Sequence, residues 1–286
     1  MQKEFVINWH ITEACNYACR FCFAHWENRN RIDLIKSQPE AFELIKQIKQ
    51  AFDQYISPKW GFDALRINFA GGEPLLYAEQ LSAIAHYCRE LGINTSLITN
   101  GAYLLEKSFS LEYFNMIGIS IDSLDADINL EIGRHNRKKA LLDVVALQNY
   151  LIDQKTQYPE LDIKINTVVN SANRFEDMST FIMKVKPSKL KIFKILPVLT
   201  DELSISDYDF QQYLMRHDEL KHIIVSEDNS EMTASYLMID PVGRFYSNSG
   251  AIESQQYQYS APILQKGVLA ALGEIEFDLV KFCARY

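Results

Sequence analysis

Three closely spaced cysteines constrain this chain more than any other feature. Cys15, Cys19 and Cys22 have C-x3-C-x2-C spacing and follow a short apolar run. Soft thiolate sulfur selects zinc, Cu(I) or iron–sulfur clusters, and structural zinc sites are closed by four protein ligands. A fourth cysteine is missing from this stretch, because Cys88 and Cys283 each stand alone far along the chain. The motif predicts a metal-binding loop with an incomplete ligand set.

An incomplete set of thiolates favours a reactive iron–sulfur cluster. Three thiolates leave one iron of a [4Fe–4S] cluster without a protein ligand, and so open to a small molecule, whereas most electron-transfer clusters take four. Two other interpretations stay open at this point. The loop can bind zinc with His10 or His25 as the fourth ligand, or the three cysteines can be buried without function.

The cysteine motif resembles the signature of the radical S-adenosylmethionine (SAM) superfamily, in which the open iron chelates SAM. Further stretches are similar to the viperin family and its microbial relatives, and they occur in the same order along the chain. They are C-N-Y-A-C-R-F-C-F at residues 15–23, I-N-F-A-G-G-E-P at 67–74, I-S-I-D-S at 119–123, I-G-R at 132–134, K-I-N-T-V-V-N at 164–170 and S-Y-L at 235–237.

Strand and helix patterns alternate along most of the chain. At 286 residues and 48% hydrophobic content, the chain can build one substantial α/β core. We expect strands at residues 5–11, 65–69, 93–99, 117–121, 162–170 and 189–194, and helices at 39–55, 77–91, 140–152, 175–185 and 206–220. Short strands at 235–239 and 243–246 and one or two helices within 268–284 complete the prediction.

Six β-α units predict an α/β fold, the partial (β/α)6 barrel of radical SAM enzymes. We expect residues 1–200 to form the barrel and residues 201–286 to form a C-terminal extension that caps the active site within the same globular unit. Ligands of such barrels bind at the C-terminal ends of the strands.

Composition restricts the compartment and the partners. No apolar run approaches the ~18 residues of a membrane-spanning helix, and Met1 is followed almost at once by the first strand, so we expect a cytoplasmic protein without membrane attachment. Five cysteines, three of them clustered, suit a reducing compartment. A net charge of −8 argues against nucleic-acid binding but does not exclude one anionic small molecule.

A glycine pair after the second expected strand predicts close approach of the backbone to a ligand. The stretch resembles the motif of the superfamily that contacts the amino group of SAM's methionine. The resemblance implies further SAM contacts from three positions downstream, although a serine in a strand is often only a tolerated small residue. The expected SAM-binding residues are Gly71, Gly72, Glu73, Asn100, Ser120 and Arg134.

Three lysines on two neighbouring strands predict an anionic ligand. Lys164 lies on one strand, and alternation places Lys189 and Lys191 on one face of the next. Unpaired ammonium groups inside a barrel are costly to bury, so a triphosphate would have to meet them. The alternative is a solvated edge strand. With residues that the resemblance adds, the expected nucleotide-binding set is Asn8, Arg66, Lys164, Asn166, Lys189 and Lys191, where Arg66 can instead form a rim salt bridge.

The resemblance also implies a reaction. One electron from a flavodoxin- or ferredoxin-type donor passes through the cluster to SAM, and the resulting 5′-deoxyadenosyl radical takes hydrogen from ribose C4′ of a nucleoside triphosphate. Loss of the 3′-hydroxyl as water gives a 3′-deoxy-3′,4′-didehydro nucleotide, a chain terminator in antiviral or antiphage defence. Tyr236 corresponds to the proposed hydrogen donor, and CTP is the first expectation for the substrate, with UTP and GTP as alternatives.

Two competing functions can be weighed against this one. A radical SAM enzyme that matures peptides would usually carry a cysteine-rich C-terminal extension, and only Cys283 lies there. A zinc-stabilised binding protein is the non-enzymatic alternative. Residues 23–26 depart from the continuation that animal viperins have after the third cysteine, so the base preference does not carry over.

Overall fold

A single curved sheet of ten strands organises the fold. The computed structural model describes residues 3–22, 32–106, 109–196, 201–227, 234–248 and 257–285. The strand order is β10-β9-β8-β1-β2-β3-β4-β5-β6-β7, and among the described residues β10 and β7 are its two edges. Neighbouring strands from β8 through β1 to β7 run parallel, whereas β9 is antiparallel to β8 and β10. The sheet is the open, partial barrel that the sequence predicts.

The six predicted barrel strands are confirmed, with bounds that differ by a few residues at most. The strands are β1 (Glu4–His10), β2 (Ala64–Ala70), β3 (Asn94–Thr99), β4 (Met116–Ser120), β5 (Asp162–Val169), β6 (Lys189–Lys194), β7 (Ile224–Glu227), β8 (Met238–Ile239), β9 (Arg244–Ser247) and β10 (Gln258–Pro262). The sequence did not predict β7 or β10, because four or five residues are too few to show a clear alternation of apolar and polar side chains.

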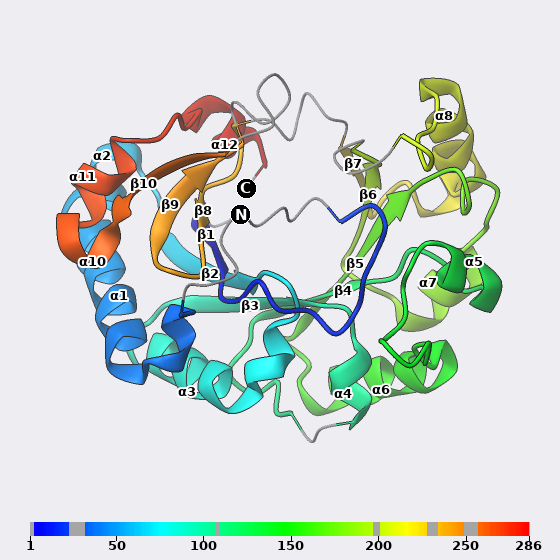
Figure 1. Cartoon of the computed structure of the whole chain (residues 1–286), viewed down its shortest axis with the longest axis horizontal. Coiled ribbons are helices and arrows are strands. Elements are labelled where there is room, and N and C mark those ends of the chain that lie inside the picture. The colour runs from blue at the N-terminus through cyan, green and yellow to red at the C-terminus, as the bar shows by residue number, and fades with distance from the viewer. Residues whose placement is uncertain are drawn as a thin grey trace.

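Helices cover the convex side of the sheet, as Figure 1 shows for α1, α3, α6 and α7. The helical segments are η1 (Leu34–Lys36), α1 (Gln38–Ala51), η2 (Phe52–Ile56), α2 (Ser57–Trp60), η3 (Pro74–Tyr77), α3 (Ala78–Glu90), α4 (Ala102–Glu106), α5 (Ala126–Glu131), α6 (Val144–Gln157), α7 (Ser179–Val185), α8 (Asp207–Arg216), η4 (Asp218–Leu220), α10 (Ile263–Lys266), α11 (Val268–Leu272) and α12 (Leu279–Arg285). No helix in these described parts is long and apolar enough to span a membrane.

Two helix starts differ from the prediction for local reasons. The helix expected from residue 140 begins at Val144, because the Asp143 side chain caps it by accepting a 2.9 Å hydrogen bond from the amide of Ala146. The helix expected from residue 175 begins at Ser179, and Phe175 is 69% exposed. The helix is therefore shorter than the apolar pattern in the sequence predicts, because Phe175 does not pack into the core.

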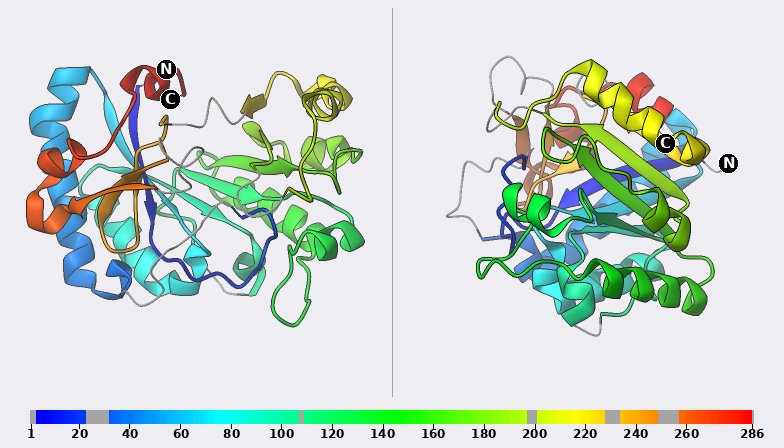
Figure 2. Two further views of the ribbon diagram at one scale, coloured as in Figure 1. Left: turned by 45° about the horizontal axis from the view of Figure 1, so that its top comes forward. Right: turned by 90° about the vertical axis from the view of Figure 1, so that its right-hand side faces the viewer.

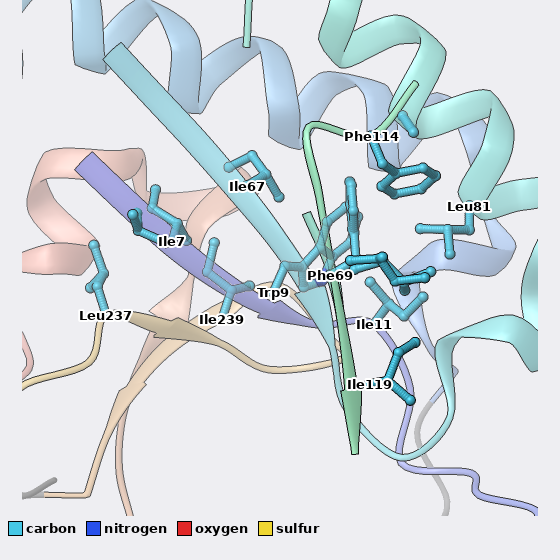
Figure 3. Close-up of a cluster of buried hydrophobic side chains, with 14 of the residues drawn as sticks. Ile7, Trp9, Ile11, Ile67, Phe69, Leu81, Phe114, Ile119, Leu237 and Ile239 are labelled. Atoms are coloured by element: carbon cyan, nitrogen blue, oxygen red, sulfur yellow. The ribbon is translucent and has the colours of Figure 1, made fainter. Parts of the chain in front are cut away.

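The two faces of the sheet differ in chemistry. On β1 and β2 the side chains of Ile7, Trp9, Ile67 and Phe69 are almost completely buried against the helices, and Figure 3 shows them in one apolar cluster. The alternate positions, which face the inside of the barrel, include several polar side chains on both strands. These polar side chains make the inside of the barrel a candidate ligand site.

The C-terminal third adds strands to the sheet as well as helices. β8 pairs with β1, and β9 and β10 extend that edge, while α12 packs Phe282 against Phe5 with 5.4 Å between the ring centroids. The predicted boundary at residue 200 lies outside the described residues. Figure 2 shows these C-terminal elements beside the N-terminal strand.

Candidate functional site

The cysteine loop follows β1 and rests on the glycine pair after β2. The amide of Gly72 donates to the Thr12 carbonyl at 2.8 Å, and the amide of Glu73 donates to the Ala14 carbonyl at 2.8 Å. A Cβ atom on Gly72 would lie 2.1 Å from the Ala14 oxygen, and one on Gly71, which has φ +128°, would lie 2.5 Å from the Thr12 oxygen. Only glycine allows the two loops to approach this closely.

Glu73 holds the ends of two strands together. Its buried carboxylate accepts hydrogen bonds from the Thr99 hydroxyl at 2.7 Å, the Asn100 amide at 2.9 Å and the Leu75 amide at 3.0 Å. Burial raises the pKa of this carboxyl, and the three hydrogen bonds act in the opposite direction. Because the carboxylate is used within the protein, a contact of this residue with SAM would come from its backbone.

None of the three cysteines is in a disulfide, and Cys15 and Cys19 are partly buried while Cys22 is exposed. Burial raises the pKa of Cys15 to about 11 and also raises that of Cys19. The described residues contain no group of three His, Cys, Asp or Glu side chains that could hold a metal ion. Thiolates that bind separate irons of a cluster need not converge on one point, so this donor set suits an iron–sulfur cluster better than a single ion.

Arg134 lies directly beside this loop. Its guanidinium forms an ion pair with Asp122 at 2.9 Å, donates to the Cys19 sulfur at 3.7 Å and donates to the Ser120 carbonyl. Gly133, with φ +77°, brings this segment against the loop, because a Cβ there would lie 2.4 Å from the Ala18 oxygen. The structure therefore places Arg134 and Ser120 next to the cysteines.

Asn100 completes this group. Its side-chain nitrogen donates to the Asn16 side chain at 2.7 Å and lies 3.9 Å from the Cys15 sulfur. Its side-chain oxygen accepts from the Ala102 amide at 3.0 Å. All six residues expected to bind SAM thus lie around the cysteine loop. Arg134 follows α5, and the other five are at or just beyond the C-terminal ends of β2, β3 and β4. This is the end at which ligands bind in β/α barrels.

Deeper in the barrel, polar side chains form a chain across β1, β2 and β3. The Asn68 amide donates to the Asn8 side chain at 2.7 Å, and the Ser96 hydroxyl donates to Asn68 at 2.7 Å. Asn8 also donates to the Leu237 carbonyl of the segment before β8 at 3.3 Å. Asn8 faces the interior, as predicted, and these contacts use part of the hydrogen-bonding capacity of its side chain.

Lys164 and Lys189 face the interior of the barrel. Lys164 and Lys189 are directly paired in register on β5 and β6, and within the described part of the chain neither side chain makes a hydrogen bond or an ion pair. Burial lowers the pKa of Lys164 well below its usual value, and the neighbouring charges of Lys191, Arg66 and Lys189 lower it further. Such a group of cations can accept an anion.

The alternative that Lys189 and Lys191 lie on a solvated edge strand is wrong, because β7 pairs with the outer side of β6. Arg66 faces the same interior and forms an ion pair with Glu4 at 3.1 Å. Gly118 on β4 leaves room for the neighbouring lysine, since a Cβ atom there would lie 3.1 Å from Cε of Lys164.

Lys191, Tyr236 and Glu227 form a hydrogen-bonded triad. Along β6, Lys191 lies two residues closer to the C-terminal end of the strand than Lys189. The Tyr236 hydroxyl donates to Glu227 at 2.7 Å and accepts from Lys191 at 2.9 Å, and Lys191 also forms an ion pair with Glu227. The expectation that all three lysines lack a protein partner is therefore wrong for Lys191. Asn166 is paired in register with Lys191, and its buried carbonyl oxygen has no partner among the described residues.

Glu227 was not predicted as a site residue. It ends a four-residue strand and opens an acidic, polar stretch that reads as a solvated loop. Only its pairing in the sheet, where it lies opposite Phe193 of β6, shows that it faces the interior.

His10 is a core residue. Its Nδ1 lies 2.6 Å from the Tyr246 hydroxyl, and burial lowers its pKa to about 4, so the ring is neutral near pH 7. His25, the other possible zinc ligand, and the rest of residues 23–26 lie outside the described residues.

Known proteins match this chain in sequence over nearly its whole length. Residues 9–151 match the model of the radical SAM superfamily. The chain is 39% identical to the S-adenosylmethionine-dependent nucleotide dehydratase of Psychrobacter lutiphocae, over 99% of this chain and 95% of that one. It is 37% identical to the enzyme of the same description from Pseudoalteromonas ulvae, over 99% and 93%. The chain belongs to the viperin family of radical SAM enzymes.

Solved structures support the fold of this viperin-family chain. SuiB of Streptococcus suis bound to S-adenosylmethionine aligns with a TM-score of 0.63 at 16% identity, over 99% of this chain and 68% of that one. Native anSMEcpe with bound AdoMet and a peptide aligns with a TM-score of 0.65 at 16% identity, over 99% and 84%. Membership of the viperin family implies SAM and an iron–sulfur cluster. The family therefore excludes the alternative of a non-enzymatic, zinc-stabilised binding protein.

Proposed function

We propose that this protein is a SAM-dependent nucleotide dehydratase, which removes water from a nucleoside triphosphate. The observation that carries the proposal is that Lys164 and Lys189 lie inside the barrel and neither has a hydrogen-bond or ion-pair partner among the described residues. A charged amine in a confined polar interior is costly without a counter-ion, so a bound anion stabilises the charged form of these lysines, and a triphosphate supplies that anion. The names of the viperin-family relatives support the same reaction.

The order of residues along the barrel supports one orientation of the substrate. The cysteines and Arg134 lie at the C-terminal end of the strands, Lys191 and Asn166 lie within β6 and β5, and Lys164 and Lys189 lie one alternation closer to the N-terminal end. A nucleotide with its phosphates on these two lysines would place its ribose between Tyr236 and the SAM site. The reacting carbon would then face the bound cofactor.

The cofactors would be held by Cys15, Cys19 and Cys22 for a [4Fe–4S] cluster, with SAM beside Arg134 and Ser120. When bound, they supply a carbon radical that removes the hydrogen atom from ribose C4′. Loss of the 3′-hydroxyl as water then requires one proton and one further electron for the product to be a closed-shell 3′,4′-alkene.

The protein's own part is to bind, orient and supply the proton. Lys164 and Lys189 bind the phosphates, and the free carbonyl oxygen of Asn166 accepts a hydrogen bond from a ribose hydroxyl. Tyr236 holds the required proton at its phenol oxygen, where Glu227 accepts the hydrogen bond and Lys191 donates one. A positioned acid of this kind contributes roughly 10²–10⁴-fold to rate.

The product lacks the 3′-hydroxyl that a polymerase extends, so we include antiviral or antiphage chain termination in the proposal. CTP is the first candidate substrate. A flavodoxin- or ferredoxin-type protein in the cytoplasm would supply both electrons.

The test is anaerobic incubation of the reconstituted protein with SAM, dithionite and each of CTP, UTP, GTP and ATP separately. Mass spectrometry follows 5′-deoxyadenosine and nucleotides lighter by one water. We expect one triphosphate to stimulate SAM cleavage and to give a dehydrated product, which also identifies the base. SAM cleavage that none of the four triphosphates stimulates would overturn the nucleotide substrate and leave the radical SAM fold standing.

A further inference from the structure

A tight turn between α5 and α6 is fixed by its own hydrogen bonds. The amide of Lys139 donates to the Asn136 carbonyl at 2.8 Å, and the amide of Asn136 donates to the Ala140 carbonyl at 3.0 Å. The Asn136 side chain accepts from the amides of Lys138 and Ala140, both at 2.9 Å. These bonds hold residues 136–140 in one conformation, with Lys139 at φ +59°.

The turn presents three exposed cations, Arg137, Lys138 and Lys139. In the described part of the chain, none of these side chains forms an ion pair or a hydrogen bond. The nearest acidic neighbours in sequence are Glu131 and Asp143, and the latter carboxylate caps α6. In a chain of net charge −8, the turn is a small unneutralised positive site.

This positive site lies against the cysteine loop. Asn136 forms an isolated antiparallel bridge with Tyr17, which lies between the first two cysteines. The same segment brings the Arg134 guanidinium to 3.7 Å from the Cys19 sulfur, and the amide of Arg20 donates to the Ile132 carbonyl at 3.0 Å. Figure 2 shows the segment between α5 and α6 as a loop that projects from the barrel.

We propose that the turn formed by Arg137, Lys138 and Lys139 is the docking site for an acidic one-electron carrier protein. The inference rests on the proposed iron–sulfur cluster of the cysteine loop. A reduced flavoprotein or ferredoxin-type carrier loses one electron at this site and the cluster gains it, with no bond made or broken. The position beside the cysteine ligands shortens the path of that electron.

The size and charge of the site favour such a carrier over a polyanion. Transient electron-transfer complexes use small interfaces, below about 1,200 Å², and electrostatic attraction steers their encounter. A nucleic acid requires an extended basic surface. Here three cations stand on one turn of an acidic protein.

The test compares two charge-reversal variants of the reconstituted full-length protein. The first is Arg137→Glu, Lys138→Glu and Lys139→Glu. The second changes the same net charge at exposed lysines on other surfaces, with Lys59→Glu, Lys184→Glu and Lys221→Glu. Calorimetry measures the binding of an oxidised acidic flavodoxin, and stopped-flow absorbance measures cluster reduction by the reduced carrier and, separately, by dithionite.

We expect the turn variant alone to lose carrier binding and to be reduced by the carrier at least ~10-fold more slowly at low salt. Salt near 1 M, where the screening length is about 3 Å, should remove the difference from the wild type. Dithionite should reduce both variants alike. Equal losses in the two variants, or none in the turn variant, would overturn the proposal, as would heparin or RNA binding that depends on the turn while carrier binding does not.

The dithionite measurements separate this inference from the proposed function. If dithionite-driven dehydration of every nucleotide fails while the carrier still binds through the turn, the proposed function fails and the docking site stands.

Discussion

The Tyr236 hydroxyl donates a 2.7 Å hydrogen bond to Glu227, a residue at the end of the edge strand β7. Tyr236 precedes β8, which lies on the far side of β1 in the sheet. The hydrogen bond therefore joins two parts of the open barrel that share no strand pairing. Lys191 contacts both residues and links the pair to the barrel interior.

We expect Glu227→Gln to reduce dehydrated product formation by about 10- to 100-fold, because the phenol loses its charged hydrogen-bond acceptor. The KM for the nucleotide should stay the same or fall, since Lys191 loses its anionic partner and gains attraction for phosphate. Steady-state kinetics with mass spectrometric detection separates the two parameters. A higher KM with unchanged kcat would contradict a role in proton supply.

Tyr236→Phe removes the hydroxyl and keeps the ring. We expect SAM cleavage to remain largely intact while product formation falls by about 10²-fold or more. The ratio of 5′-deoxyadenosine to dehydrated nucleotide is the direct measurement. If this ratio in the variant equals that of the wild type, the assignment of Tyr236 as the hydrogen donor is wrong.

Lys164→Met should raise the KM for the triphosphate at least ~10-fold, because a charge-assisted contact to phosphate is lost. The same change should stabilise the nucleotide-free protein, because it removes a desolvated cation beside other cations. Calorimetric unfolding and nucleotide titration test both effects. A variant with lower stability and unchanged KM would show that Lys164 is structural.

Lys164 also predicts a pH dependence. Its folded pKa lies below its unfolded value, so between these two values the unfolded state binds more protons and stability rises with pH. The contribution is unfavourable below the folded pKa and disappears above the unfolded pKa of about 10.4. We expect the wild type, compared with Lys164→Met, to gain stability as pH rises through this window, as measured by chemical denaturation. Parallel curves for the two proteins would contradict the expectation.

Gly72→Ala should prevent cluster binding while leaving the sheet folded. The added Cβ would lie 2.1 Å from the Ala14 oxygen and push the cysteine loop away. Gly273→Ala is the matched control, because its Cβ would meet its nearest neighbour at an ordinary 3.6 Å. Iron content after reconstitution and far-ultraviolet circular dichroism report the two properties. Full iron loading of Gly72→Ala would show that the loop adapts.

Alternation of apolar and polar residues predicted the barrel strands, and the resemblance to the radical SAM superfamily supplied most of the residues around the cysteine loop. Alternation identifies β1 and β2, and the glycine pair lies where two backbones touch. The partners of the site residues could not be predicted, because they come from distant segments. Glu4 pairs with Arg66 across two strands, and Glu227 reaches Lys191 only through the short strand β7. Neither pairing leaves a periodic trace in the sequence.

The pairing of β1 with β8 affects how the chain folds during synthesis. The amide of Asn8 bonds to the carbonyl of Leu237 at 2.9 Å, so the first strand depends on a partner made more than 200 residues later. β2 can pair with the opposite edge of β1 much earlier, and it brings the glycine pair with it. Because chains fold as they emerge, the support for the cysteine loop is available long before Tyr236 is synthesised. The nascent protein can therefore assemble the cysteine loop with its glycine support first and the Tyr236–Glu227 contact last.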